Sequence, residues 1–414
     1  MTPVELNDWQ ALLLAFSGSA FVSLYSLPKI VRVARQRRLS DPLGRHKIHR
    51  REIPALGGVA IFAGFAVGLL LTGSGFMTGL PFLTASVIML FFTGLKDDMV
   101  TVTPWKKIVF QVAAGTILFL FTDLKFTDLH GFLGIHHIPA WVSFALTVFL
   151  IVIIINSFNL IDGIDGLAAS VGIIASAAFG TWFWLSGDRG FAIASAALAG
   201  SLAVFLVFNL SNGRYKIFMG DTGSLITGFI LTVMAIRFNE INAGPSPFIK
   251  LHSSPSVSIA ILIVPLFDSL RVIIIRLIRH QPPMKADNRH IHHLLLRAGF
   301  NHRQATLLIA AANILIIAMA FLLDSLGIFR LGFVILLICT SLTVPVYVMV
   351  AKRENWRILN NRLWKLILSD PKELDVYRNL VVFIDEHRAK PARPEPEAEA
   401  AVTHLGAGEA EKAK

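Results

Sequence analysis

The chain has 414 residues, of which 54% are hydrophobic and only 16% are charged, and its formal net charge is +11. This low charge content, together with repeated apolar stretches of about 20 residues, is typical of a polytopic helical membrane protein and excludes an ordinary soluble domain. The positive charge gathers in the loops between these stretches, so it indicates membrane topology and predicts no nucleic-acid partner.

Eleven apolar stretches predict an all-α bundle of about eleven membrane-spanning helices. They cover residues 8–27, 55–73, 77–95, 106–122, 140–157, 167–186, 190–210, 223–238, 256–276, 304–323 and 328–350. Lys and Arg concentrate in the loops after the odd-numbered stretches, which predicts a cytoplasmic location for these loops and for the C-terminus, and an external N-terminus. The single cysteine, Cys339, allows no disulfide framework.

The motif LKDDMVTVTPWKK follows the third stretch and carries the adjacent aspartates Asp97 and Asp98. Aspartates near helix ends commonly form caps or turns. Two neighbouring carboxylates also attract a hard divalent cation, and Mg²⁺ characteristically binds one or two carboxylates together with substrate phosphates. The motif leaves a cap and a metal ligand as alternatives.

The motif NLIDGIDG connects the fifth stretch to the sixth. Asp162 and Asp165 are three residues apart and each is followed by glycine. Both aspartates can form turns, or both can face one cavity if the segment winds helically. The glycines allow a ligand to approach the backbone closely.

The motif FMGDTGS follows the seventh stretch and opens the eighth. Gly220 and Gly223 flank Asp221 in this segment. Free N–H groups at a helix start suit a phosphate, and a carboxylate there suits the metal that accompanies it. The pattern is not a Walker loop, because the GxxxxGK sequence is missing.

A histidine motif, RHIHH, follows the ninth stretch and holds His290, His292 and His293 beside Arg289. Zinc is disfavoured because no cysteine lies nearby and the acidic motifs prefer hard cations. Histidines flanked by arginine suit hydrogen bonds to phosphate oxygens.

An intramembrane charge pair is predicted within the ninth stretch, where Asp268 and Arg271 stand three residues apart. Such a pair is costly unless it satisfies itself or faces a polar cavity. The spacing therefore leaves a brace within the bundle and a role at the site as alternatives.

The four loop motifs follow odd-numbered stretches and the Asp268–Arg271 pair lies near the end of the ninth, so all gather at the predicted cytoplasmic face. A Mg²⁺-bound pyrophosphate that is attacked by a membrane-borne phosphate suits this set, because phosphoryl transfer needs mostly positioning and charge neutralisation. No separate nucleotide-binding domain is recognisable, so a nucleotide would dock in these loops.

The ordered motifs resemble the polyprenyl-phosphate N-acetylhexosamine-1-phosphate transferases, glycosyltransferase family 4. The matching segments are HKIHRREIPALGG, LKDDMVTVTPWKKIVFQ, NSFNLIDGIDGLAAS, FMGDTGSLITGF, VPLFDSLRV and RHIHHLLLRAGF. The HIHH form is similar to the WecA-like branch. Ile291 interrupts the three consecutive histidines of the MraY-like branch, which argues against a UDP-MurNAc-pentapeptide substrate.

The resemblance implies transfer of an N-acetylhexosamine 1-phosphate, typically that of N-acetylglucosamine, from its UDP derivative to undecaprenyl phosphate, with release of UMP. It implies a multi-pass protein of the bacterial inner membrane with its active site on the cytoplasmic face, and Mg²⁺ as cofactor, for which Mn²⁺ could substitute. The product would start a lipid-linked glycan such as O-antigen, common antigen, teichoic acid or exopolysaccharide. Assembly is left open between a monomer and a homodimer.

The resemblance also implies roles for individual residues. Asp97 and Asp98 would bind Mg²⁺ and activate the lipid phosphate, and Asp221 would be a further Mg²⁺ ligand. The remaining catalytic residues would be His290, His292 and His293, in the sugar or pyrophosphate pocket. The substrate-binding residues would be Lys47, His49, Arg50, Lys107, Asn159, Asp162, Asp165, Asp268 and Arg289.

Two other classes compete with this interpretation. A transporter would use acidic residues for an ion path, but such residues would lie near the midplane. A membrane prenyltransferase would show Asp-x-x-x-Asp-like spacing. Within the transferase class, direct attack by the lipid phosphate is favoured over a phospho-enzyme, because a phosphate monoester is already largely dianionic at neutral pH.

Three regions are predicted along the chain. Residues 1–351 form the membrane-embedded catalytic domain, and residues 352–390 form a cytoplasmic helical extension. Residues 391–414 are rich in Pro, Ala and Glu and are predicted to be a disordered tail without a catalytic task.

Overall fold

A computed structural model describes residues 7–37, 39, 53–73, 75–132, 134–244, 250–281 and 289–353. Two compact units divide the chain, Met1–Leu368 and Ser369–Lys414, and all described residues belong to the first. The predicted phosphate-gripping residues Lys47, His49 and Arg50 lie outside the described residues, as do nearly all of the predicted extension and the whole predicted tail.

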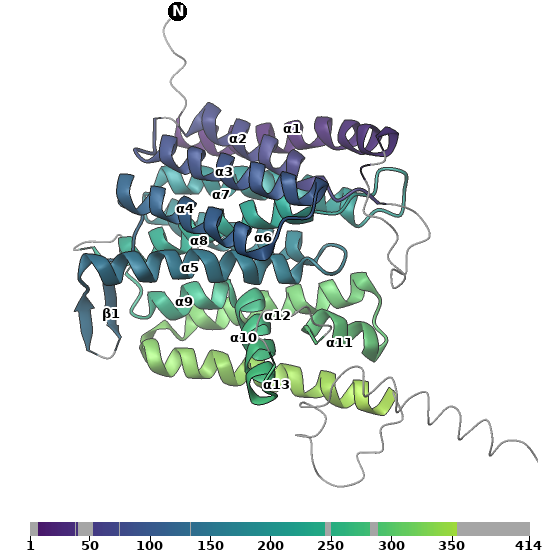
Figure 1. Ribbon diagram of the computed structural model, residues 1–414. Helices are drawn as coiled ribbons and strands as arrows, with labels where there is room; N and C mark the ends of the chain where they lie inside the picture. Colours follow the sequence, from purple (N-terminus) through teal and green to yellow (C-terminus); the bar gives the residue numbers. More distant parts are fainter. Residues whose placement is uncertain are drawn as a thin grey trace, which may run out of the picture. The chain divides into compact units, whose positions relative to one another are not determined.

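The described residues form a helical bundle, as predicted (Figure 1). The first seven helices are α1 (Asp8–Gln36), α2 (Gly57–Thr72), α3 (Leu80–Met99), α4 (Pro104–Phe121), α5 (Ala140–Ile161), α6 (Leu167–Leu185) and α7 (Arg189–Asn209). The others are α8 (Gly220–Ala243), α9 (Ser254–Ile261), α10 (Ile263–Ile278), α11 (Ile291–Ala298), α12 (His302–Leu322) and α13 (Ile328–Arg353). A short 3₁₀ turn, Asp324–Leu326, links α12 to α13.

Within the described part of the chain, nine helices are long and apolar enough to cross a membrane, and a bent pair would make a tenth. The chain is therefore a multi-pass membrane protein. Compared with the eleven predicted stretches, the number found within these residues is lower by one or two. Each predicted stretch does form helix, but α2 has only 16 residues, and the ninth stretch is broken into α9 and α10.

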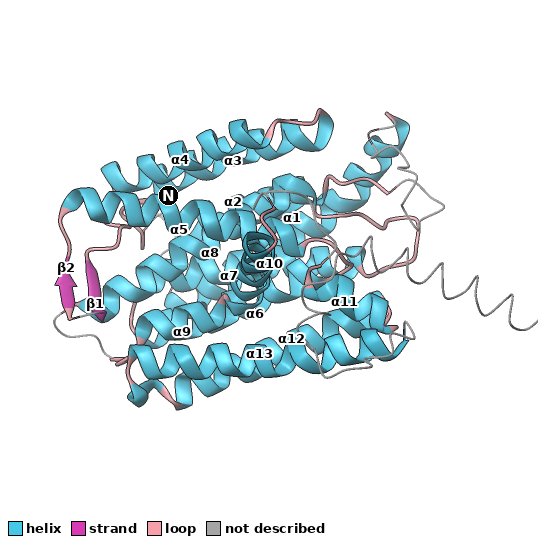
Figure 2. Ribbon diagram, turned by 60° about the horizontal axis from the view of Figure 1, so that its bottom comes forward, coloured by secondary structure: helices cyan, strands magenta, loops and turns pink. Residues whose placement is uncertain are grey.

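The break between α9 and α10 bends the chain by 85°. Pro265 lies in the first turn of α10. A proline there has no N–H to donate to the carbonyl of Ile261, the last residue of α9, so the helix loses a hydrogen bond at this point and breaks more easily. As a result α10 crosses the other helices, which run roughly side by side (Figures 1 and 2).

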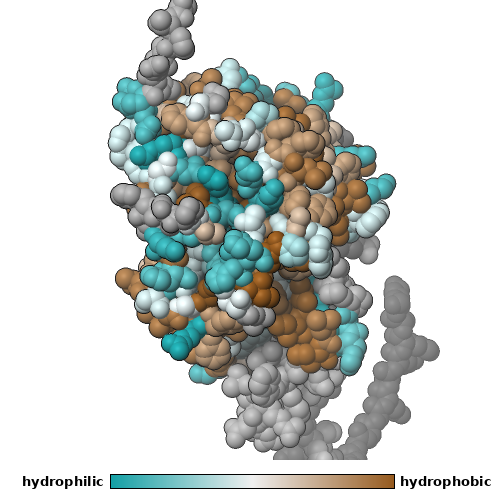
Figure 3. All heavy atoms as spheres, turned by 90° about the vertical axis from the view of Figure 1, so that its left-hand side faces the viewer, coloured by the Kyte–Doolittle hydropathy of each residue, from teal (hydrophilic) through white to brown (hydrophobic). Residues whose placement is uncertain are grey.

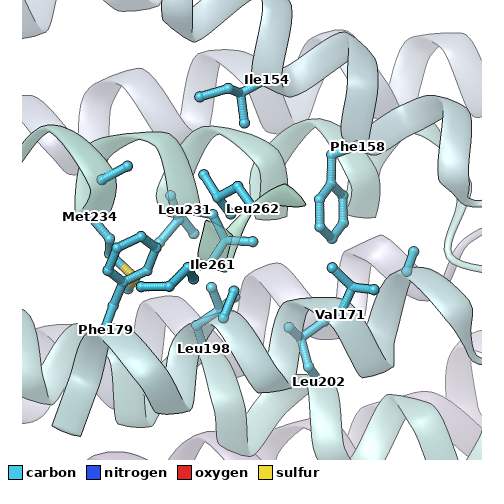
Figure 4. Close-up of a cluster of buried hydrophobic side chains, with 14 of the residues drawn as sticks. Ile154, Phe158, Val171, Phe179, Leu198, Leu202, Leu231, Met234, Ile261 and Leu262 are labelled. Atoms are coloured by element: carbon cyan, nitrogen blue, oxygen red, sulfur yellow. The ribbon is translucent and has the colours of Figure 1, made fainter. Parts of the chain in front are cut away.

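Helix α8 is the most enclosed of the candidate spans, with 83% of its apolar window buried, compared with 22% for α4. It packs against α2, α3, α5 and α6. Around it, side chains from α5, α6, α7, α8 and α9 interlock in the apolar core (Figure 4). The start of α8 is thus held from several sides, which matters because Asp221 lies there.

Glycines bring two other helices against the start of α8. A Cβ atom at Gly58 of α2 would lie 2.1 Å from the main-chain nitrogen of Gly223, and one at Gly94 of α3 would lie 2.4 Å from Cα of Thr222. Only glycine permits these backbone approaches. The end of α3, with its two aspartates, is therefore fixed directly over the first turn of α8.

A small antiparallel hairpin was not predicted. Its strands are β1 (Asp128–Phe132) and β2 (Ile135–His137), between α4 and α5. Figure 3 looks at the end of the bundle that carries the hairpin, where hydrophilic side chains gather between hydrophobic patches. This end lies opposite the one at which the predicted site residues meet.

Candidate functional site

Three helix ends meet around the side chain of Lys107, which lies in the first turn of α4. Its Nζ atom lies 2.5 Å from Oδ2 of Asp97 and 2.7 Å from Oδ2 of Asp221. Asp97 comes from the last turn of α3 and Asp221 from the first turn of α8. Residues 124 positions apart in the sequence thus place their carboxylates around one cation.

The second aspartate of the pair, Asp98, caps helix α8 from another part of the chain. Its Oδ1 accepts a hydrogen bond from the main-chain N–H of Asp221 at 2.7 Å. Its Oδ2 accepts from the main-chain N–H of Thr222 at 3.0 Å and from the Thr222 hydroxyl at 2.5 Å. Asp98 thus caps the start of α8, a different helix end from the one at which the pair itself stands.

An amide of α5 contacts the same cluster. The Asn159 side chain donates hydrogen bonds to Oδ1 of Asp221 and, at 2.7 Å, to Oγ of Ser224. One turn earlier, Nδ2 of Asn156 donates to Oε1 of Gln111 at 2.7 Å. The predicted nucleotide-loop residue Asn159 is therefore a direct neighbour of the predicted metal ligand Asp221.

The NLIDGIDG segment begins in the last turn of α5 and then lies beside the start of α8. Asp162 accepts a hydrogen bond from the backbone of Gly220. Burial raises the pKa of Asp162 well above its usual range, and the nearby carboxylates of Asp98 and Asp165 add to this effect. Asp162 therefore faces the same cluster as Asp97, Asp98 and Asp221.

Asp165 points to a different set of neighbours. Its Oδ2 lies 2.6 Å from Nζ of Lys216 and 3.7 Å from Nδ1 of His302. Its main-chain carbonyl accepts a hydrogen bond from the Thr306 hydroxyl at 2.8 Å. These contacts join the NLIDGIDG segment to the loop before α8 and to the start of α12.

The histidine motif lies at the start of α11, next to the NLIDGIDG segment. A Cβ atom at Gly163 would lie 2.2 Å from Nε2 of His292. The rings of His290 and His292 are nearly parallel, with centroids 5.7 Å apart, and the His293 ring lies 4.2 Å from that of His292. The histidines and the acidic cluster therefore meet along one segment.

His292 is 1% exposed, and neither of its ring nitrogens has a hydrogen-bond partner. Burial lowers its pKa to about 3, and the neighbouring His293 contributes to the shift. His292 is thus a neutral imidazole whose two ring nitrogens make no hydrogen bond within the protein.

The structure brings most of the predicted residues to one end of the bundle. Asp97, Asp98, Lys107, Asn159, Asp162 and Asp221 form the acidic cluster. The histidines lie beside it, and Arg289 and Asp268 lie behind them. Roles at the site had not been predicted for Lys216, Thr222 or His302. Lys216 stands five residues before Asp221, which was the one signal that could have drawn attention to it.

No group of three or more His, Cys, Asp or Glu side chains is arranged to hold a metal ion within the described ranges. The donor set nevertheless fits Mg²⁺, which needs only one or two carboxylates when substrate phosphates and water supply the remaining ligands. Asp97 and Asp221 provide two carboxylates that already converge on one cation, the Lys107 ammonium.

An apolar cavity of about 150 Å³ borders the histidines. It is lined by side chains of α5, α10, α12 and α13, among them Phe267, Leu308 and Val346, and His292 lies on its wall. A second and more polar cavity, of about 600 Å³, lies at the opposite end of the bundle near Asp188 and Arg237. Only the smaller one adjoins the predicted site.

Comparison with known proteins gives consistent results. The family described as "Glycosyl transferase family 4" matches residues 80–239. The undecaprenyl-phosphate alpha-N-acetylglucosaminyl 1-phosphate transferase of Escherichia coli (strain K12) is 31% identical over 298 residues, which are 71% of this chain and 78% of that protein. A probable undecaprenyl-phosphate N-acetylglucosaminyl 1-phosphate transferase of Bacillus subtilis (strain 168) is 31% identical over 79% of this chain and 89% of its own length.

Proposed function

Because the chain belongs to glycosyl transferase family 4, we propose that it transfers N-acetylglucosamine 1-phosphate from UDP-N-acetylglucosamine to undecaprenyl phosphate and releases UMP. The observation that carries this proposal is the convergence of Asp97 and Asp221 on Lys107, next to Asp98, Asn159 and Asp162. A cluster of carboxylates and a cation at one end of a membrane bundle suits a substrate with a pyrophosphate and an acceptor that is a lipid.

Mg²⁺ is the cofactor that this donor set favours, and Asp97 and Asp221 are the residues that would hold it. When bound, the ion would neutralise charge on the pyrophosphate oxygens and polarise them. Asp98 is the less available of the paired carboxylates, because its oxygens already accept three hydrogen bonds from the first turn of α8. We therefore assign Asp98 to holding Asp221 in place.

In the reaction, an oxygen of the lipid phosphate attacks the phosphorus that carries the sugar, and the bond from that phosphorus to the bridging oxygen breaks. UMP leaves with the bridging oxygen. The attacking monoester is already largely dianionic at neutral pH, so direct attack needs little help from a base. Lys107 would turn from the carboxylates to the phosphate oxygens when substrate binds, and the neutral His292 would offer hydrogen bonds to the sugar or pyrophosphate.

The acceptor's isoprenoid chain needs an apolar surface close to the reacting phosphate. The cavity that borders His292 has such a surface, contributed by α5, α10, α12 and α13. We assign this cavity to the first isoprene units of undecaprenyl phosphate.

The site end of the bundle is proposed to face the cytoplasm of a bacterial inner membrane. The basic loops after odd-numbered spans support this orientation, and cytoplasmic nucleotide sugars require it. The N-terminus would then lie outside and the C-terminal extension and tail inside. Lys47, His49 and Arg50 would contribute phosphate contacts from the first basic loop. A homodimer is compatible with this arrangement.

The test is UMP release by purified protein supplied with UDP-N-acetylglucosamine, undecaprenyl phosphate and Mg²⁺. We expect turnover that stops when the metal is chelated and returns with Mg²⁺ or, more weakly, Mn²⁺. UDP-MurNAc-pentapeptide should give none, because Ile291 interrupts the histidine run. Absence of turnover with every nucleotide sugar, in folded protein with intact lipid, would refute the proposal and revive the transporter alternative.

A further inference from the structure

Asp268, which was predicted to bind substrate, makes three close contacts within the protein. The residue is 2% exposed. Its Oδ2 lies 2.9 Å from Nδ1 of His290. Its Oδ1 accepts hydrogen bonds from the main-chain N–H of Ile291 at 2.9 Å and from Nη2 of Arg271 at 2.8 Å. Asp268 also lines the cavity beside His292, but three contacts leave its carboxylate little capacity for a ligand, so its influence on the site passes mainly through its neighbours.

We propose that Asp268 is a positioning residue that fixes the orientation and the proton position of His290 for the transfer reaction. This inference rests on the function proposed above. A carboxylate that also accepts from Arg271 is ionised, so Nδ1 of His290 must carry the hydrogen in their contact. Nε2 is then the nitrogen that is left for the substrate, and a neutral ring presents it as a hydrogen-bond acceptor or a base.

Arg271 makes this arrangement rigid. It neutralises Asp268 and also donates hydrogen bonds to the main-chain carbonyl of Arg289 and to the Tyr347 hydroxyl. Asp268 therefore ties α10 to His290 and Ile291, and Arg271 ties it to Arg289 just before them. Through the Tyr347 hydroxyl, Arg271 also ties α10 to α13. The bend at Leu262 matters here, because it directs α10 across the bundle toward this segment.

The orientation of His290 affects the rest of the site through the neighbouring His292 ring. The parallel stacking of His290 on His292, and the contact of His292 with Gly163, connect Asp268 to the NLIDGIDG segment. A rotated His290 ring could not keep this stacking. The proposed chain of contacts runs from α10 through two imidazoles to the acidic cluster.

The decisive variant is Asp268→Asn. The asparagine carbonyl can still accept from Ile291 and Arg271, but its NH₂ group can only donate, so His290 must move its hydrogen to Nε2. We expect kcat for UMP release to fall on the order of 100-fold or more, as happens when a histidine is held in the wrong tautomer, while KM for the UDP-sugar changes much less.

A double-mutant cycle tests whether Asp268 acts by positioning His290 or only stabilises the packing of α10. If Asp268 acts through His290, then Asp268→Asn should cost less than about threefold in activity when it is added to His290→Gln, because the two changes remove one function. Tyr347→Phe removes one of the two other partners of Arg271 and leaves the Asp268–His290 contact in place, so it should stay close to wild type. If wild-type protein is active and the activity losses of the two single variants multiply in the double variant, this inference is overturned and the proposed function is not. Inactive wild-type protein would overturn the proposed function as well. Melting temperatures of all variants would identify any that fail to fold.

Discussion

The Asp98 carboxylate of α3 accepts hydrogen bonds from both the main-chain N–H and the hydroxyl of Thr222 in α8. This contact replaces the local N-cap, because Met219 before the helix offers no side-chain hydrogen bond. The first N–H groups of a helix need such partners when they are buried. One aspartate of the DD pair thus stabilises the helix that carries Asp221, while the other faces Lys107.

Removing the Thr222 hydroxyl should weaken this cap. Thr222 is fully buried, so Thr222→Val loses one charge-assisted hydrogen bond, worth about 1.5 kcal/mol or more, without changing the side-chain volume. We expect a lower melting temperature in detergent and a reduced rate of UMP release. Thr232→Val is the matched control, because that hydroxyl donates only to Gly228 of its own helix. Equal effects of the two changes on activity would contradict a role for the Asp98–Thr222 contact.

Lys107→Met should make the protein depend on Mg²⁺ for its stability. Without the ammonium group, the carboxylates of Asp97 and Asp221 repel each other, so the variant should melt below wild type in a chelator. Added Mg²⁺ should then raise the melting temperature more in the variant than in wild type. Lys106→Met, at an exposed position next to it, should behave like wild type. The same Mg²⁺-induced shift in all three proteins would argue against a cation site at Asp97 and Asp221.

Gly163→Ala should impair activity by displacing His292. The added methyl group would lie 2.2 Å from Nε2 of the buried ring, so either the ring or the NLIDGIDG backbone must move. We expect at least a tenfold loss of kcat/KM, equivalent to about 1.4 kcal/mol of transition-state stabilisation. Gly213→Ala, where a Cβ meets no heavy atom within 4 Å, should retain activity. An active Gly163→Ala enzyme would mean that the position of His292 does not matter.

Much of the architecture could be predicted, because a bilayer demands apolar helices of a fixed length and the chain repeats them. The gathering of the motifs at one end of the bundle could also be predicted, because loops after alternate spans lie on the same side of the membrane. The pairing of charges could not be predicted. Whether Asp165 faces a ligand or Lys216, and whether Asp268 faces a cavity or His290, depends on contacts between distant segments. The hairpin was missed because its two strands are too short to give a clear alternating pattern.

Acid should destabilise the protein partly through His292. Burial lowers the pKa of this residue from its ordinary 6.5 to about 3. Between these values the unfolded chain takes up a proton at this position and the folded protein does not. The contribution of His292 to stability should therefore level off above pH 6.5 and fall as the pH drops toward 3, with a slope of up to about 1.4 kcal/mol per pH unit. The melting temperature of wild type should fall more steeply between pH 7 and pH 5 than that of His292→Gln, whose side chain does not titrate. Parallel curves for wild type and His292→Gln would show that His292 can be protonated in the folded state, and the hydrogen bonds proposed from its neutral ring would then need revision.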